Sequence, residues 1–110
     1  MEQKIIIGNW KNYLNKDESV KLAEEILNEK IPDKIRLMIS PNNIYLNQVN
    51  DILKQSSVEV ISQNVTSYKS SSDTGGVTII GLKDIGVDRT ILGHSEVRRR
   101  NKSFKSEEIL

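Results

Sequence analysis

The sequence predicts an α/β fold with a parallel sheet, because strand-like and helix-like segments alternate along its 110 residues. Short apolar runs are followed by longer segments in which apolar residues recur at helical spacing. Strands that alternate with helices pair in parallel through right-handed crossovers. The pattern therefore predicts a doubly wound sheet or a β/α barrel, and periodicity does not choose between them.

The first predicted unit is a strand followed by a capped helix. Residues 5–7 are consecutive isoleucines, a continuous β-branched run typical of a strand buried on both faces. Asn15 and Glu18 have the spacing of a capping box, and apolar residues at helical spacing then continue until the region of Pro32. We expect a helix to begin after Asn15.

Two further units and a long loop follow. Residues 35–39 predict a strand that Pro41 ends, and residues 44–53 carry a helical apolar stripe. A third strand is expected at residues 58–61, and the serine- and glycine-rich residues 67–76 predict a loop.

The last predicted unit leads to a group of polar residues. A short helix over residues 77–85 ends at Gly86, and residues 90–92 predict a fourth strand. In either fold the ligand site lies at the carboxyl ends of the strands. The polar residues that follow the predicted strands are Asn9, Lys11, Gln63, Asn64, His94 and Glu96.

Composition narrows the classes of function. A formal charge of +1 gives no overall field that would gather nucleic acid or an anionic membrane. The absence of cysteine excludes disulfides and thiolate metal sites, and it is compatible with a cytoplasmic location. The apolar run at residues 5–7 is far too short for a signal sequence or a membrane span. We expect a cytoplasmic protein with a small-molecule substrate.

Three polar side chains are candidates for chemistry, each with a structural alternative. His94 is the only histidine, so without cysteines it makes no metal site, and acid/base or electrophilic work is open to it. Lys11 is either a solvated lysine or a point charge for phosphate or an oxyanion. Asn9 either turns the chain or donates to a substrate oxygen. The basic run at residues 98–100 is interpreted as a solvated charge cluster.

Two motifs together resemble the triosephosphate isomerase family. They are Gly-Asn-Trp-Lys at residues 8–11 and Ile-Leu-Gly-His-Ser-Glu at residues 91–96. Their order agrees with the family, as do Gln63-Asn64, Thr74-Gly75 and the segment 82–86 between them. The resemblance covers essentially the whole chain, and it implies that residues 1–110 are the N-terminal half of a TIM (β/α)8 barrel.

The resemblance also implies an activity and its residues. The family interconverts dihydroxyacetone phosphate and D-glyceraldehyde 3-phosphate, in glycolysis and gluconeogenesis, through an enediolate and with no cofactor or metal. A neutral histidine polarises the substrate carbonyl there. By this resemblance His94 is the electrophile, Asn9 and Lys11 bind substrate, and the supporting residues are Glu96, Ser95 and Thr74. A homodimer is implied, with Thr74 at the tip of a loop that reaches the other subunit.

The chain departs from the family pattern in several ways. Gly76 stands where an acidic residue usually follows Thr-Gly, Val97 stands where an arginine is usual, and Phe104 lies farther from His94 than expected. A whole barrel needs about 250 residues. The family's glutamate base and phosphate-binding loops have no counterpart, and neither glutamate at 107–108 matches that base.

Half a barrel leaves open sheet edges and apolar side chains without cover. We therefore expect association with a missing C-terminal half or with a second copy. A non-catalytic half-barrel that acts as a fragment or interaction module is the alternative function. A flavodoxin-like phosphate-binding domain would explain the βα repeat, but neither motif.

Overall fold

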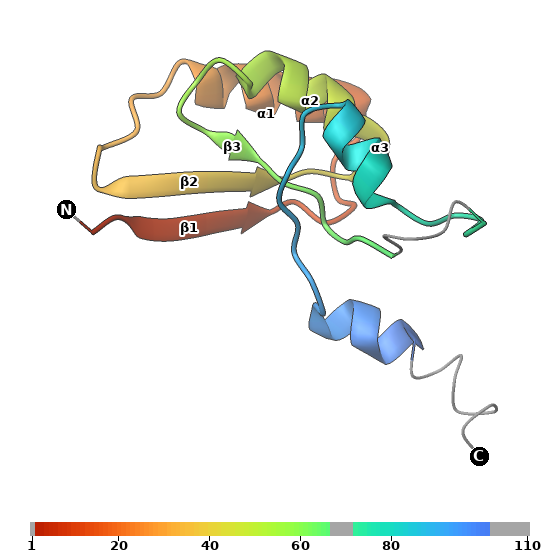
Figure 1. Cartoon of the computed structure of the whole chain (residues 1–110). Coiled ribbons are helices and arrows are strands. Elements are labelled where there is room, and N and C mark those ends of the chain that lie inside the picture. The colour runs from red at the N-terminus through yellow and green to blue at the C-terminus, as the bar shows by residue number, and fades with distance from the viewer. Residues whose placement is uncertain (1, 67–71, 102–110) are drawn as a thin grey trace.

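The computed structural model describes residues 2–66 and 72–101, and its centre is a three-stranded parallel sheet. The strands are β1 (Lys4–Asn9), β2 (Ile35–Ser40) and β3 (Glu59–Val60), in the order β1-β2-β3. All three point the same way in Figure 1, so their carboxyl ends meet at one edge of the sheet. The predicted α/β class with parallel pairing is confirmed.

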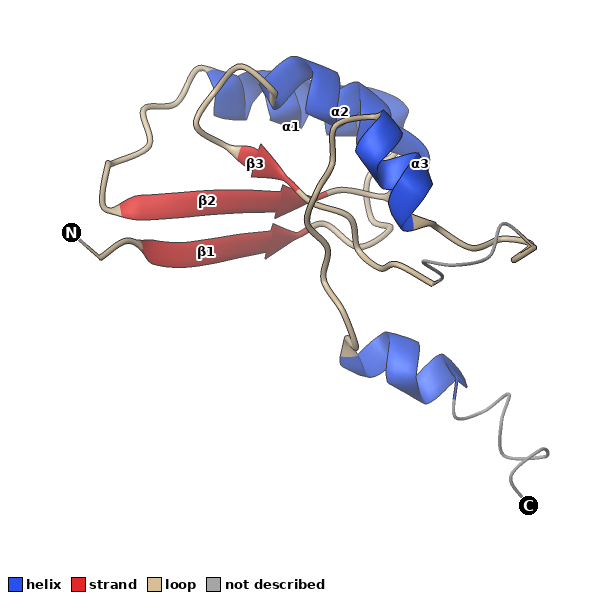
Figure 2. Cartoon of the chain, viewed as in Figure 1, coloured by secondary structure: helices blue, strands red, loops and turns tan. Residues whose placement is uncertain are grey.

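Helices separate the three strands along the chain, as the pattern predicts, and further helices follow the last strand (Figure 2). Asn15 caps α1 in a capping box with Glu18, because each side chain accepts the other residue's backbone N–H. The helices are α1 (Lys16–Leu27), the 3-10 helix η1 (Asn43–Tyr45), α2 (Leu46–Leu53) and α3 (Ile79–Asp84), and residues 95–101 are also helical.

Helix α3 is shorter than predicted because Thr78 caps it. The Thr78 hydroxyl accepts the Gly81 backbone N–H at 3.1 Å, and Thr78 itself keeps an extended backbone. The helix therefore begins at Ile79 rather than residue 77. It ends before Gly86, as predicted.

The predicted fourth strand does not form, although the chain at this position runs parallel to the sheet as expected. Residues 90–92 form no strand, and a single parallel bridge joins Thr90 to Ser62. The backbone N–H of Ile91 donates to Ser62 O at 2.9 Å, and that of Ser62 donates to Arg89 O at 3.0 Å. Pairing stops there because β3 is itself only two residues long and offers little further ladder.

The main core lies between the sheet and helices α1, α2 and α3, which gather along one side of it in Figure 1, whereas the helix at residues 95–101 lies apart from them. Ile39 and Val60 from the strands contact a cluster that includes Val49 and Leu53 of α2. Burial of these apolar side chains is the principal force that holds the helices to the sheet.

The first strand is not buried on both faces, which corrects the sequence prediction. The exposed fractions of Ile5, Ile6 and Ile7 are 56%, 49% and 49%. The reason is that β1 lies at the edge of the sheet, with β2 as its only strand neighbour among the described residues. The open edge expected of a half-barrel is therefore present.

No helix in the described ranges is long and apolar enough to cross a membrane.

Candidate active site

Lys11 lies just beyond β1 in a strained backbone conformation. Its φ of 51° is in the left-handed region, which costs a residue with a side chain about 1–3 kcal/mol. Neighbouring amides hold it there: Asn9 Oδ1 accepts the Lys11 backbone N–H at 2.9 Å, and Gln63 Nε2 donates to Lys11 O at 2.7 Å. Gln63 also donates to Ser40 O at 3.2 Å, so one amide ties β2 to the segment after β1.

His94 forms the start of the helix at residues 95–101. Its carbonyl accepts the Arg98 backbone N–H at 3.0 Å, and its imidazole Nδ1 accepts the Glu96 backbone N–H at 3.0 Å. Gly93 precedes it with a φ of 69°, a turn that glycine makes without strain. Because Nδ1 is an acceptor, the ring is neutral and carries its proton on Nε2. The side chain is thus a neutral hydrogen-bond donor.

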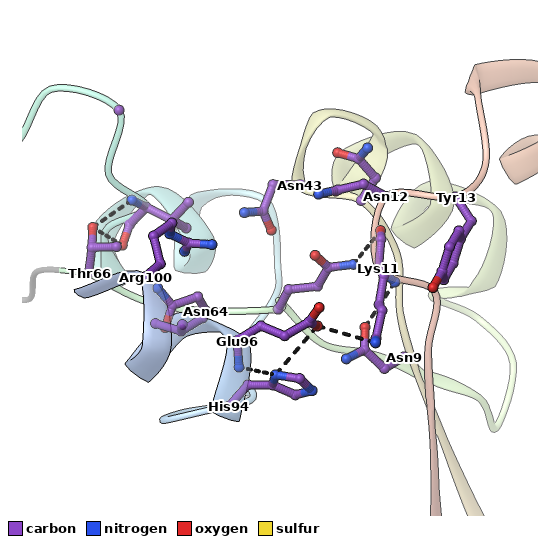
Figure 3. Close-up of a pocket in the computed structure, with 15 residues that line it drawn as sticks. Asn9, Lys11, Asn12, Tyr13, Asn43, Asn64, Thr66, His94, Glu96 and Arg100 are labelled. Atoms are coloured by element: carbon purple, nitrogen blue, oxygen red, sulfur yellow. Dashed lines mark hydrogen bonds and ion pairs between the residues drawn. The ribbon is translucent and has the colours of Figure 1, made fainter. Parts of the chain in front are cut away.

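Glu96 connects the helix at residues 95–101 with the segment after β1 through an ion pair with Lys11. Its Oε1 lies 3.2 Å from Lys11 Nζ, and the two side chains point toward each other in Figure 3. The hydrogen bond from Lys11 lowers the pKa of Glu96 below its ordinary value, and the charge of Lys11 lowers this pKa further. The same Oε1 lies 3.6 Å from His94 Nδ1, too far for a hydrogen bond and next to a nitrogen that already accepts one. Glu96 therefore stays ionised, and its partner is Lys11.

These residues line one cavity of about 490 Å³ at the carboxyl edge of the sheet (Figure 3). Every polar residue that the sequence placed after a strand lies there, so the shared edge of a parallel sheet brings them together as expected. They are Asn9, Lys11, Gln63, Asn64, His94 and Glu96. Ser95 and Thr74 do not line it, and both are exposed.

The sequence interpretation missed other residues of the cavity. Arg100 belongs to the basic run that the sequence indicates is a solvated cluster, but it lines the cavity, whereas Arg98 does not. The signal was the four-residue spacing from Glu96, which places both side chains on one helix face. Tyr13 and the amides of Asn12, Asn42 and Asn43 also line the cavity.

The departure at Gly76 has a structural cause. A Cβ at this residue would overlap the Asp73 carboxylate and the Thr66 hydroxyl. Thr66 Oγ1 donates to Asp73 Oδ2 at 2.7 Å, and the Val77 backbone N–H donates to Thr66 Oγ1 at 2.8 Å. The loop is closed across residue 76, so any side chain there requires Asp73 or Thr66 to move. Val97 lines the cavity, as Gly75 does.

The cavity provides donors and positive charge but no free base. Glu96 is the only carboxylate among its described lining residues, and it is paired with Lys11. The described ranges also contain no group of three histidine, cysteine or acidic residues that would hold a metal ion. Phe104 and the glutamates at 107–108 lie outside the described residues. The arrangement can bind and polarise an anionic oxygen compound.

Fold and candidate site together are consistent with the N-terminal half of a β/α barrel, with a polar cavity at the carboxyl edge of the parallel strands. The sequence model of triosephosphate isomerase matches residues 4–109. The chain belongs to the triosephosphate isomerase family.

Individual relatives agree with this assignment. The chain is 31% identical over 99 residues to the triosephosphate isomerase of Thermoanaerobacter pseudethanolicus, covering 90% of this chain and 40% of that protein. It is 38% identical over 93 residues to that of Treponema pallidum, covering 84% and 37%. It is 35% identical over 99 residues to that of Clostridium acetobutylicum, covering 90% and 40%. The chain thus spans about two fifths of the length of these relatives.

Proposed function

We propose that this chain supplies the electrophilic and substrate-binding part of a triosephosphate isomerase. The completed site interconverts dihydroxyacetone phosphate and D-glyceraldehyde 3-phosphate through an enediolate. The observation that carries the proposal is the junction of Lys11, Glu96 and a neutral His94 at one cavity. Two segments more than eighty residues apart in the sequence meet there.

Each residue has a role that its chemistry supports. His94 Nε2–H donates to the substrate carbonyl oxygen and to the negative charge that grows on it in the enediolate. Lys11 adds a positive charge, and the Asn9 amide has an N–H₂ donor left, because its Oδ1 accepts the Lys11 backbone N–H. Fixed donors of this kind stabilise developing charge because they need no reorganisation during the reaction. Glu96 is a positioning residue that holds the Lys11 ammonium.

The proton transfer needs a group from the rest of the barrel. A general base must reach the carbon-bound proton, and the single carboxylate of the described cavity is already paired. We therefore assign the base and the phosphate contacts to the part of the protein that the relatives have and this chain does not span. The whole protein in this proposal is a cytoplasmic homodimer, with the exposed Thr74 at the subunit contact.

The missing base also favours a second candidate, a half-barrel that binds other chains without catalysis. One experiment separates the two. The C-terminal portion of the Thermoanaerobacter relative, beyond the matched region, is joined to this chain, and isomerisation is followed with a coupled dehydrogenase assay. We expect turnover that His94→Asn lowers about 10²–10³-fold, the loss typical of removing one oxyanion donor.

Arg98→Gln is the matched control, since Arg98 is exposed and does not line the cavity. It should leave turnover unchanged. A folded fusion without turnover would contradict the isomerase proposal and support the non-catalytic one. Turnover that survives His94→Asn undiminished would contradict the role of His94.

A further inference from the structure

An ionic cluster lies at the amino end of the sheet, far from the cavity. Arg36 of β2 donates to Glu59 of β3 with two nitrogens, Nε to Oε2 at 2.5 Å and Nη2 to Oε1 at 2.8 Å. Arg89 places Nη1 3.0 Å from Glu59 Oε1. One carboxylate is therefore shared between two guanidinium groups.

The cluster faces away from the helices. Side chains alternate between the two faces of a strand. Leu37 next to Arg36, and Val58 and Val60 on either side of Glu59, all pack into the core beneath the helices. Arg36 and Glu59 therefore project from the opposite face, which becomes the interior when a barrel closes.

The open face around the cluster is also apolar. Ile5 pairs in register with Arg36, and Ile7 pairs with Met38, so both isoleucines share the face of the cluster. They are 56% and 49% exposed. An ionic cluster beside uncovered isoleucines indicates a surface that another part of a protein covers.

The net charge of the ionic cluster limits which chemical groups can cover this face. Arginine stays ionised at any pH that proteins meet, and the hydrogen bond from Arg36 lowers the pKa of Glu59, which therefore stays ionised too. The cluster of Arg36, Glu59 and Arg89 thus carries one excess positive charge. Asp88 lies 3.2 Å from Arg89 Nη1, but its side chain is 73% exposed, so water and salt screen this contact.

We propose that this face receives the C-terminal part of the barrel and that this part places a carboxylate against the Arg36–Glu59–Arg89 cluster. The inference rests on the proposed function, since it takes the occupant from the three fifths of the relatives' length that this chain does not span. Closure removes water from the face, and two guanidinium groups that share the single carboxylate of Glu59 then keep an uncompensated positive charge, which is unfavourable away from water. A second copy of this chain would bring a second excess positive charge, so charge argues against self-pairing.

A double-mutant cycle tests the proposal. The probe is the C-terminal portion of the Thermoanaerobacter relative as a separate polypeptide. It is made in pairs of versions that carry either Glu or Gln at the first inward-facing residue of one strand, and each strand is tested in turn. Its dissociation constant with this chain is measured by titration calorimetry. We expect at least one Glu version to bind about tenfold tighter than its Gln counterpart, and Arg89→Gln to abolish that advantage. Arg98→Gln, the exposed control, should preserve it.

Three outcomes would overturn the inference: no Glu version binds tighter, the advantage persists in Arg89→Gln, or no version associates. Sedimentation that shows this chain dimerising more tightly than it binds the probe would replace the occupant with a second copy. Turnover of the complex is read separately. A Glu-dependent complex without turnover keeps this inference and contradicts the isomerase proposal, whereas turnover without Glu dependence does the reverse.

Discussion

Two substitutions of His94 should separate its role as the cap of the helix at residues 95–101 from its proposed role as a donor to the substrate. The imidazole Nδ1 accepts the Glu96 backbone N–H at 3.0 Å, where a helix N-cap side chain normally bonds. His94→Ala removes this acceptor and leaves the Glu96 N–H without its partner. His94→Asn removes the imidazole, but asparagine is among the best N-cap residues and restores an acceptor.

The expected magnitude follows from the single bond that is lost. Replacing a capping side chain with alanine costs about 1 kcal/mol, which corresponds to an opening equilibrium roughly fivefold higher for the first turn of the helix. Hydrogen exchange of the Glu96 amide reports this opening directly. We expect about fivefold lower protection in His94→Ala and near-normal protection in His94→Asn.

The two variants should agree on activity and disagree on exchange. Both lack the Nε2–H donor, so both should lose turnover in the completed enzyme. Equal protection of the Glu96 amide in the wild type and His94→Ala would refute the cap, and with it the argument that Nδ1 is an acceptor and the ring neutral. A nitrogen-15 spectrum of the ring that shows the proton on Nδ1 would refute it independently.

Three further predictions concern residues around the site and the sheet. The pKa of Glu59 is lowered in the folded state, chiefly by the hydrogen bond from Arg36. The ionised Glu59 carboxylate therefore stabilises the fold above its ordinary pKa of 4.5, and this stabilisation is lost as the pH falls through the lower folded value. The urea midpoint should therefore drop more steeply in acid for the wild type than for Glu59→Gln, and parallel profiles would contradict the coupling. Gly76→Ala should lower the midpoint, because its Cβ overlaps the Asp73 carboxylate, and Asp73→Ala in the same chain should recover part of the loss; a neutral Gly76→Ala would argue against the closed loop. Lys11→Gly should be about 1 kcal/mol more stable than Lys11→Ala in urea unfolding, because only glycine relieves the left-handed backbone; equal stability would show that residue 11 carries no strain.

The sequence alone determined the features that local chemistry encodes. The capping box of Asn15 and Glu18 specified the start of α1, and Pro41 stopped β2 one residue beyond the predicted end. Alternating periods implied parallel strands, and parallel strands imply a shared carboxyl edge. For that reason the sequence alone places the candidate residues from Asn9 to Glu96 at one site.

Tertiary structure decided what depends on distant contacts. The left-handed backbone of Lys11 is held by Gln63, 52 residues away, and the pairing of Arg36 with Glu59 requires the register in which Met38 lies beside Glu59. The exposure of β1 and the reduction of the fourth strand to one bridge reflect which neighbours are present, not what those residues prefer. A local pattern specifies the period and the ends of an element, because those arise from contacts within a few residues. Register, strain and burial arise only when segments far apart in the chain meet, so for this protein they became visible only in the folded structure.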